Sequence, residues 1–258
     1  MGIFKGLFDY REMIIELVKR DIRGRYKKSI LGFLWMLLNP MLQLAVYTVV
    51  FSKVMRMDID QFYLFIFVAL VPWIFFSTCL TSGSTIFCVQ QTMIKKVSFP
   101  REVLPVSFTI SQFVNMLLSF IVIFAAVLFS GRRIDPLALL MLPLVMAIEF
   151  VLALGIVFIT ATVNVYFRDL EHILGIVSMM WMYLTPVIYP AEMVPEEYRL
   201  LFWMNPMTSV VTAYRDILYY GRMPMTNTLL VALFMGVIIL TVGVVIFVNL
   251  QKGFAEEM

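Results

Sequence analysis

The residue types that usually perform chemistry are scarce in this chain. It has 258 residues, with one histidine, His172, and two cysteines, Cys79 and Cys88. One histidine with no cysteine cluster gives neither a plausible Ser-His-Asp set nor ligands for a structural zinc ion. The sequence also lacks a G-x-x-x-x-G-K-[ST] phosphate-binding loop. It therefore predicts no catalytic site and no metal site, and any work must draw energy from a gradient or a partner.

Two charged features could still have a function. Glu149 is the only ionisable residue deep within an apolar run, where charge is costly and often functional. A hydrogen-bonded structural glutamate is an equally good interpretation. The second feature is a basic cluster before the first apolar run: Arg20, Arg23, Arg25, Lys27 and Lys28. Such clusters attract anionic head groups at about 1 kcal/mol per charge.

The composition indicates what must position these residues. Hydrophobic residues make up 62% of the chain and charged residues 14%, whereas a soluble domain averages about 45–50% and about 25%. The net charge of +3 is too balanced for a nucleic-acid-binding protein. The sequence therefore predicts a membrane protein.

Six charge-poor runs predict an all-α, polytopic fold with six transmembrane helices in one domain, residues 1–258. They cover residues 31–52, 62–85, 104–130, 137–164, 173–189 and 229–250. At 1.5 Å per residue, such runs match a hydrocarbon core of roughly 30 Å, the fifth being the shortest. Because 8 of the 20 basic residues precede the first run, both termini are predicted to be cytoplasmic.

Two segments outside these runs are also predicted to be helical. Residues 1–28 show the apolar periodicity of an amphipathic helix lying in the membrane interface, which is compatible with packing on the protein itself. Residues 190–224 contain an apolar run that is too short to span and is broken by Asn205 and Pro206. We expect a re-entrant hairpin of two short helices that dips into the outer half of the membrane.

Polar and aromatic residues within the apolar runs leave alternatives open. Ser107, Ser111, Asn115 and Ser119 recur every four residues, a pattern that favours close helix packing over a hydrated path. The aromatic residues near the fifth run fit an interfacial belt. Trp181 and Tyr183, inside that run, are better candidates for lining a conduit.

Two cytoplasmic segments could contact a soluble partner. Residues 90–101 are polar and basic, are bounded by Pro100, and predict a short docking helix; ordinary flanking charge is the alternative. Arg168 and Asp169, on the same side, could form a local salt bridge or a second docking point.

Four segments in order then show a family resemblance. They are LVKRDIRGRYKKSILGFLWMLLNP (17–40), KKVSFPREVLP (95–105), NVYFRDL (164–170) and NPMTSVVTAYRDIL (205–218). Together they resemble the membrane permease subunits of type-2 ABC exporters for cell-surface polysaccharides. That family exports lipid-linked O antigen, teichoic acid or capsule, and the resemblance covers nearly the whole chain.

The resemblance implies a homodimer of permeases in the bacterial cytoplasmic membrane, joined by two nucleotide-binding ATPase subunits. ATP and Mg would bind those subunits, so this chain would be a transport subunit without a cofactor and not an enzyme. Contact with the ATPase would involve Lys95, Lys96, Phe99, Arg101, Arg168 and Asp169.

The resemblance also implies roles for the basic cluster and the hairpin. The polyprenyl-pyrophosphate head of a lipid-linked polysaccharide would enter near Arg20, Arg23, Arg25, Lys27 and Lys28, whose charges suit it. Residues 190–224 would form an outer gate. The candidate conduit and gate residues are Glu149, Trp181, Tyr183, Trp203, Asn205 and Pro206.

Three other functions compete with this interpretation. A type-2 ABC permease for drugs or lipids shares the fold and differs in its substrate. A proton-driven secondary transporter predicts that Glu149→Gln abolishes activity and that no second subunit is needed. A membrane-embedded transferase is disfavoured because paired carboxylates and histidines are scarce.

Overall fold

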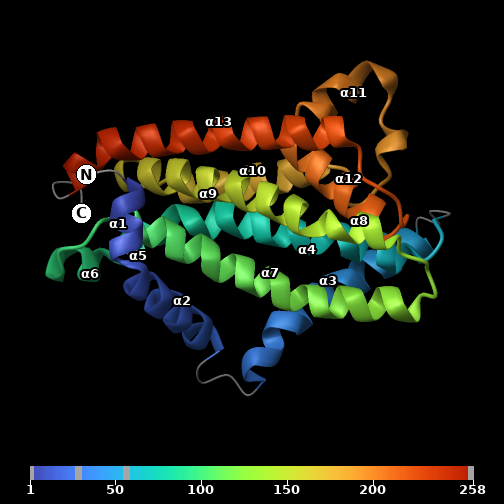
Figure 1. Ribbon diagram of the computed structural model, residues 1–258, viewed down its shortest axis with the longest axis horizontal. Helices are drawn as coiled ribbons and strands as arrows, with labels where there is room; N and C mark the ends of the chain where they lie inside the picture. The colour runs from blue at the N-terminus through green and yellow to red at the C-terminus, as the bar shows by residue number, and fades with distance from the viewer. Residues whose placement is uncertain (1–2, 27–30, 55–58, 255–258) are drawn as a thin grey trace.

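The computed structural model describes residues 3–26, 31–54 and 59–254, which fold into helices and connecting segments with no strand among them. For these residues the all-α prediction is confirmed. The molecule is elongated, and the first helix, α1, lies at the end of the molecule where the last long helix, α13, terminates (Figure 1). The larger helices are α2 (Arg11–Tyr26), α3 (Trp35–Tyr47), α4 (Phe62–Thr81), α7 (Val103–Phe129), α9 (Leu142–Tyr166), α10 (Leu170–Tyr183), α12 (Pro206–Leu218) and α13 (Thr226–Leu250).

Four helical stretches are long and apolar enough to cross a membrane. They cover Phe62–Lys96, Val103–Phe129, Pro136–Tyr166 and Thr226–Gly253, and a shorter apolar helix covers Leu37–Ser52. The chain is therefore a multi-pass membrane protein. The third of these stretches combines α8 (Pro136–Leu140) with α9.

The fifth predicted span differs from the structure. It was expected to reach residue 189, but α10 ends at Tyr183 after 14 residues, a length of about 21 Å. Pro186 follows closely, and the residue before a proline is disfavoured in helical conformation. The prediction of a helix to residue 189 is therefore wrong.

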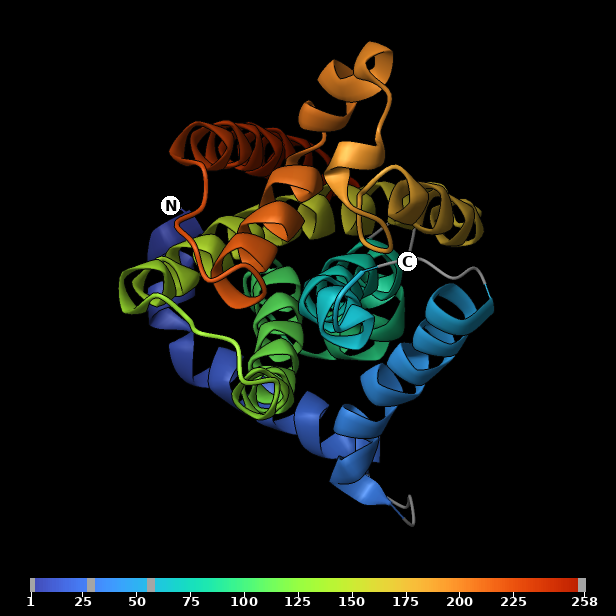
Figure 2. The same cartoon turned by 90° about the vertical axis from the view of Figure 1, so that its right-hand side faces the viewer.

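Helix α4 lies at the centre of the bundle (Figure 2). It contacts α3, α7, α9, α10 and α12, and most of its residues are buried. A helix that is apolar on every side must be surrounded, and the run FYLFIFVALVPWIFF has no polar face. The sequence of α4 thus accounts for its central place.

The amphipathic N-terminal segment is two helices rather than the single one predicted. Helix α1 (Ile3–Asp9) ends just before α2 begins. At the turn between the two helices Phe8 and Tyr10 are exposed, at 67% and 37%, and apolar packing on the core resumes only at Met13. Beyond it, Ile14 and Leu17 are buried and α2 packs on α7. Ile15 is 50% exposed, so α2 also keeps an apolar outer face, as lying in an interface requires.

Helices α9 and α13 run side by side along the molecule (Figure 1). A Cβ atom on Gly155 would lie 2.6 Å from the backbone nitrogen of Leu240, and one on Gly243 would lie 2.6 Å from the carbonyl oxygen of Gly155. Glycine lets helix backbones approach closely within a membrane. These two residues therefore set the distance between α9 and α13.

We expect Gly155→Ala to destabilise the protein, because the added methyl group must push two backbones apart. Overpacking of this kind costs about 1–3 kcal/mol, which thermal unfolding of the purified protein in detergent would detect. Gly24→Ala is the matched control, since a Cβ there would meet no atom within 4 Å. Equal unfolding temperatures for the two variants would contradict the close contact.

Candidate functional site

Helix α6 and the junction of α9 with α10, which carry predicted ATPase-docking residues, lie at the end of the molecule that holds α1 (Figure 1). Lys95 and Lys96 are exposed at the end of α6 (Gln91–Lys96), the predicted short helix. Phe99 is half-buried against the core. Arg168 and Asp169 are exposed between α9 and α10. This end thus presents charged side chains from two loops to the surrounding water.

Arg101 faces the chain itself. Its guanidinium group donates a hydrogen bond to the carbonyl oxygen of Gln251 and lies 5.5 Å from the ring centroid of Phe254. The side chain is half-buried. In this structure Arg101 therefore binds the C-terminal segment rather than pointing into solvent.

The basic cluster is described in part. Arg20 donates a hydrogen bond to Gln90 at 3.0 Å and lines a pocket of about 240 Å³ between α2, α5 (Ile86–Val89) and α7. Arg23 is exposed on α2. The side chain of Arg25, and all of Lys27 and Lys28, lie outside the described residues. A pyrophosphate site at this cluster stays a prediction.

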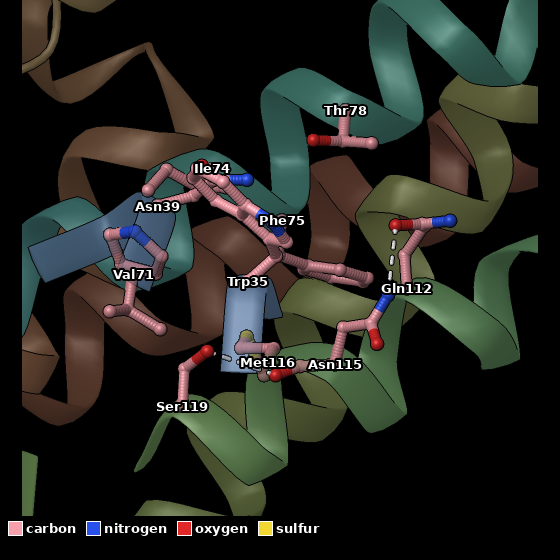
Figure 3. A pocket seen from close by; sticks show the side chains of 11 residues that line it. Trp35, Asn39, Val71, Ile74, Phe75, Thr78, Gln112, Asn115, Met116 and Ser119 are labelled. Atoms are coloured by element: carbon pink, nitrogen blue, oxygen red, sulfur yellow. Dashed lines mark hydrogen bonds between the residues drawn. The ribbon is translucent and has the colours of Figure 1, made fainter. Parts of the chain in front are cut away.

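The polar residues of α7 line two successive pockets. Ser107 and Ser111 face the pocket of Arg20. Asn115 and Ser119 line a second pocket of about 170 Å³ between α3, α4 and α7, where Asn115 lies 3.5 Å from the Gln112 side chain (Figure 3). The hydroxyl groups of the three serines donate to carbonyl oxygens of α7 itself. Satisfied within their own helix, they suit the packing interpretation better than a hydrated path.

Asn205 joins the hairpin to the end of α10. Its side-chain oxygen accepts hydrogen bonds from the Trp181 indole at 3.0 Å and from the Met207 backbone at 3.1 Å, which caps α12. Its amide donates to Leu184 at 3.2 Å and Thr185 at 2.9 Å. Two predicted gate residues, Trp181 and Asn205, are thus brought into direct contact.

An apolar pocket of about 410 Å³ lies beside this junction, between α10 and α11 (Glu196–Trp203). Trp181, Asn205 and Pro206 are among its lining residues. Trp203 is half-buried but does not line it, and Tyr183 is 60% exposed on α10. The structure therefore gathers three of the six predicted conduit and gate residues around one pocket.

Glu149 lies apart from that pocket. It is fully buried in α9 and accepts a hydrogen bond of 2.7 Å from the hydroxyl group of Tyr214 in α12. Its other carboxyl oxygen has no hydrogen-bond partner among the described residues. Glu149 lines none of the three pockets described above. Its hydrogen bond holds α12 against α9, which favours the structural interpretation.

Arg215 is the most important site residue that sequence reasoning missed. It is buried in α12 and donates to the carbonyl oxygens of Phe65 at 3.3 Å and Tyr189 at 3.2 Å. It also binds the carbonyl oxygens of Pro186 and Val187, and its guanidinium carbon lies 3.6 Å from the ring centroid of Phe65. A single cation thus holds the segment after α10 onto α4.

A signal for Arg215 was present in the sequence. It lies in α12, the second helix of the hairpin, where Asp216 is the one other charged residue. A charge in such a helix needs compensating partners. Because α12 is shorter than the long apolar runs, its buried arginine stands outside the segments in which a charge is most conspicuous.

The family model described as ABC-2 type transporter matches residues 12–219, and the chain belongs to that family. The family resemblance inferred from the four segments is confirmed.

Three relatives are similar over most of their length. The chain is 35% identical over 258 residues to the O-antigen export system permease protein RfbA of Myxococcus xanthus, covering 99% of each. It is 31% identical over 250 residues to the protein of that name from Klebsiella pneumoniae, covering 97% of this chain and 95% of the relative. The polysialic acid transport protein KpsM of Escherichia coli is 23% identical over 221 residues, covering 83% and 84%.

We expect Arg215→Lys to destabilise the protein although it keeps the charge. A lysine cannot reach carbonyl oxygens on two elements at once, and each lost charged hydrogen bond is worth about 1.5–3 kcal/mol. The unfolding temperature in detergent should fall by several degrees. Arg222→Lys is the control, because Arg222 is half-exposed and makes one ion pair, with Asp216. A fall no larger than the control's would show that Arg215 is not a structural anchor.

Proposed function

We propose that this chain is the permease subunit of an ATP-driven exporter that moves lipid-linked polysaccharide from the cytoplasmic to the outer side of the bacterial inner membrane. The observation that carries this proposal is the full-length similarity to two O-antigen export permeases. O antigen, teichoic acid and capsule belong to the same substrate class. The proposal therefore covers all three polysaccharides as substrates.

ATP hydrolysis is assigned to separate subunits, two for each exporter, which would bind ATP and Mg. The absence of a phosphate-binding loop from the sequence supports this division. Lys95, Lys96, Arg168 and Asp169 would meet those subunits, because they are exposed at one end of the molecule. Movement of the ATPase subunits would then reach the permease through α6.

For the topology, we propose six crossings with both termini in the cytoplasm. Helices α3 and α10 would cross in addition to the four long stretches, each continued by adjoining segments. Helix α3 is extended at both ends by Gly32–Leu34 and Thr48–Val54. The hairpin of α11 and α12 would be re-entrant, which agrees with its place at the end opposite α1 (Figure 1).

A homodimer would place α10 at the contact between two copies. Leu174 is its one buried residue, whereas Ile176, Met179, Met180 and Tyr183 are each more than half exposed. This face adjoins the apolar pocket and the hairpin. The polysaccharide would pass between the two copies, with the aromatic side chains of α10 available to stack on sugar rings.

Where the lipid enters, Arg20 and Arg23 are the described members of the basic cluster. Both are exposed on α2, near the inner end of the bundle. Charge-assisted hydrogen bonds from Arg to phosphate are strong and directional. The pyrophosphate head would meet this cluster before the sugars move along the dimer contact.

Depletion of the chain from its bacterium tests the function. We expect lipid-linked polysaccharide to accumulate inside the cell and to disappear from the surface, and the wild-type gene to reverse both effects. A gene carrying Lys95→Glu and Lys96→Glu together should fail, since like charges would then repel the partner's docking site if that site is acidic. Polysaccharide would be measured by separate extraction of the cell surface and the cell interior.

Arg133→Glu is the matched control for that test, because Arg133 is exposed at the opposite end of the molecule. Normal surface polysaccharide after depletion would exclude the proposed substrate. Full rescue by the doubly reversed variant would instead reject α6 as the docking helix.

A cysteine pair tests the dimer. In a variant with Cys79 and Cys88 replaced by alanine, Ile176→Cys should form a disulfide between two copies in native membranes. Ile121→Cys on α7 should not, although the two positions are similarly exposed, at 61% and 63%. Non-reducing electrophoresis would separate the outcomes, and cross-linking equal at both positions would contradict an α10 contact.

A further inference from the structure

The coupling segment is defined as α5, α6 and residues 97–102. Within α6, Met93 and Ile94 pack against the core, but no residue of this helix is buried. Every residue of α6 is at least partly exposed. A helix of six residues is not stable alone in water. Its position therefore depends on the residues on either side of it in addition to Met93 and Ile94.

On the side before α6, the anchor is Phe87. This residue of α5 is fully buried. Its ring centroid lies 4.9 Å from that of Phe254 and 6.0 Å from that of Phe247, both of which are also fully buried. Aromatic pairs at such distances contribute about 0.5–1.5 kcal/mol beyond their burial.

On the side after α6, the anchor is Arg101. It binds the carbonyl oxygen of Gln251 and lies over the ring of Phe254. A cation at the C-terminal end of a helix is favoured by the free carbonyl groups there. Both sides of the coupling segment thus meet at Phe254.

The segment around Phe254 is fixed in turn to α9. The Tyr166 hydroxyl donates a hydrogen bond of 2.6 Å to the carbonyl oxygen of Leu250, and its ring centroid lies 6.1 Å from that of Phe254. A Cβ atom on Gly253 would lie 2.5 Å from the Tyr166 oxygen. Residues 250–254 therefore connect the coupling segment to the paired helices α9 and α13.

We propose that residues 250–254 position the coupling segment, and that Arg101 and Phe254 are positioning residues for energy coupling. This inference rests on the proposed function, in which α6 receives the movement of an ATPase subunit. It adds a second route for that movement. Besides following the chain into α4 and α7, a displacement of α6 passes through Phe254 into α9 and α13.

Four variants of the permease, each in complex with its ATPase subunit, test the inference in lipid vesicles. Phe254→Ala and Arg101→Ala remove the contact. Phe254→Leu keeps an apolar side chain of similar bulk. Lys252→Ala is the matched control, since Lys252 is exposed on the same short segment. The measurements are the amount of ATPase subunit that copurifies and the polysaccharide exported for each ATP hydrolysed.

We expect Phe254→Ala and Arg101→Ala to assemble with the ATPase subunit, because the exposed face of α6 is unchanged. Export per ATP should fall by roughly fivefold or more, the size of a typical coupling between distant sites. Phe254→Leu should recover most of it, and Lys252→Ala should match the wild type. Wild-type export per ATP in both alanine variants would overturn the inference.

Folding effects can be told apart from coupling. If Phe254→Leu, like Phe254→Ala, lowered the amount of permease in the membrane while export per ATP in the surviving complexes stayed normal, residues 250–254 would serve folding alone. That result would also overturn the inference.

A substrate-free measurement separates this inference from the proposed function. The permease should change the ATPase rate of its partner even without polysaccharide, and Phe254→Ala should reduce that change. If wild-type vesicles export no polysaccharide but this response is seen, the substrate is wrong and the positioning role stands. If export is normal and the response is missing in every variant, the positioning role fails alone.

Discussion

The end of the molecule opposite α1 depends on a buried cation, Arg215, whose hydrogen bonds in the described part of the chain go to carbonyl oxygens. Arg215 directs its guanidinium group at carbonyl oxygens from α4 and from the segment after α10, and its flat face lies on Phe65. Burying a charge is tolerable only when hydrogen bonds replace its water. Because four carbonyl groups on two elements supply those bonds, neither element can move away without exposing the charge. The end of α10, the hairpin and α4 are therefore one unit.

The contacts of Asn205 and Glu149 complete that unit from two other directions. Asn205 caps α12 and binds the Trp181 indole of α10, whereas Glu149 receives the Tyr214 hydroxyl from the opposite face of the core. Each polar group in this apolar setting is a directional constraint, since an unpaired one would be costly. The hairpin is thus located by hydrogen bonds, while the long helices are located by apolar packing. Any movement of α12 away from α9 and α10 must therefore exchange a small set of hydrogen bonds.

Much of the fold followed from apolar periodicity, because the long helices are selected by length and hydropathy alone. The run of α4 predicted a transmembrane helix, and Asn205-Pro206 correctly marked the break between α11 and α12. The end of α10 was misplaced because hydropathy continues through residues 184–189 although the backbone does not. The charge of Arg215 is visible in the sequence, but its partners are not, and neither is the contact of Arg101 with Gln251. Both contacts join residues that are 150 positions apart in the chain, Arg215 with Phe65 and Arg101 with Gln251.

The glycine contact between α9 and α13 has a mechanical consequence. Two helices whose backbones touch at Gly155 and Gly243 cannot slide past each other freely, so they move as one rigid unit. Glu149 and Tyr166 lie about 26 Å apart along α9. Glu149 is hydrogen-bonded to α12 of the hairpin, and Tyr166 is hydrogen-bonded to Leu250. A tilt imposed at one end of this pair would therefore displace the other end as well. The two helices then form one rigid element that links Tyr166 to Glu149, and α4 packs against α9 beside it.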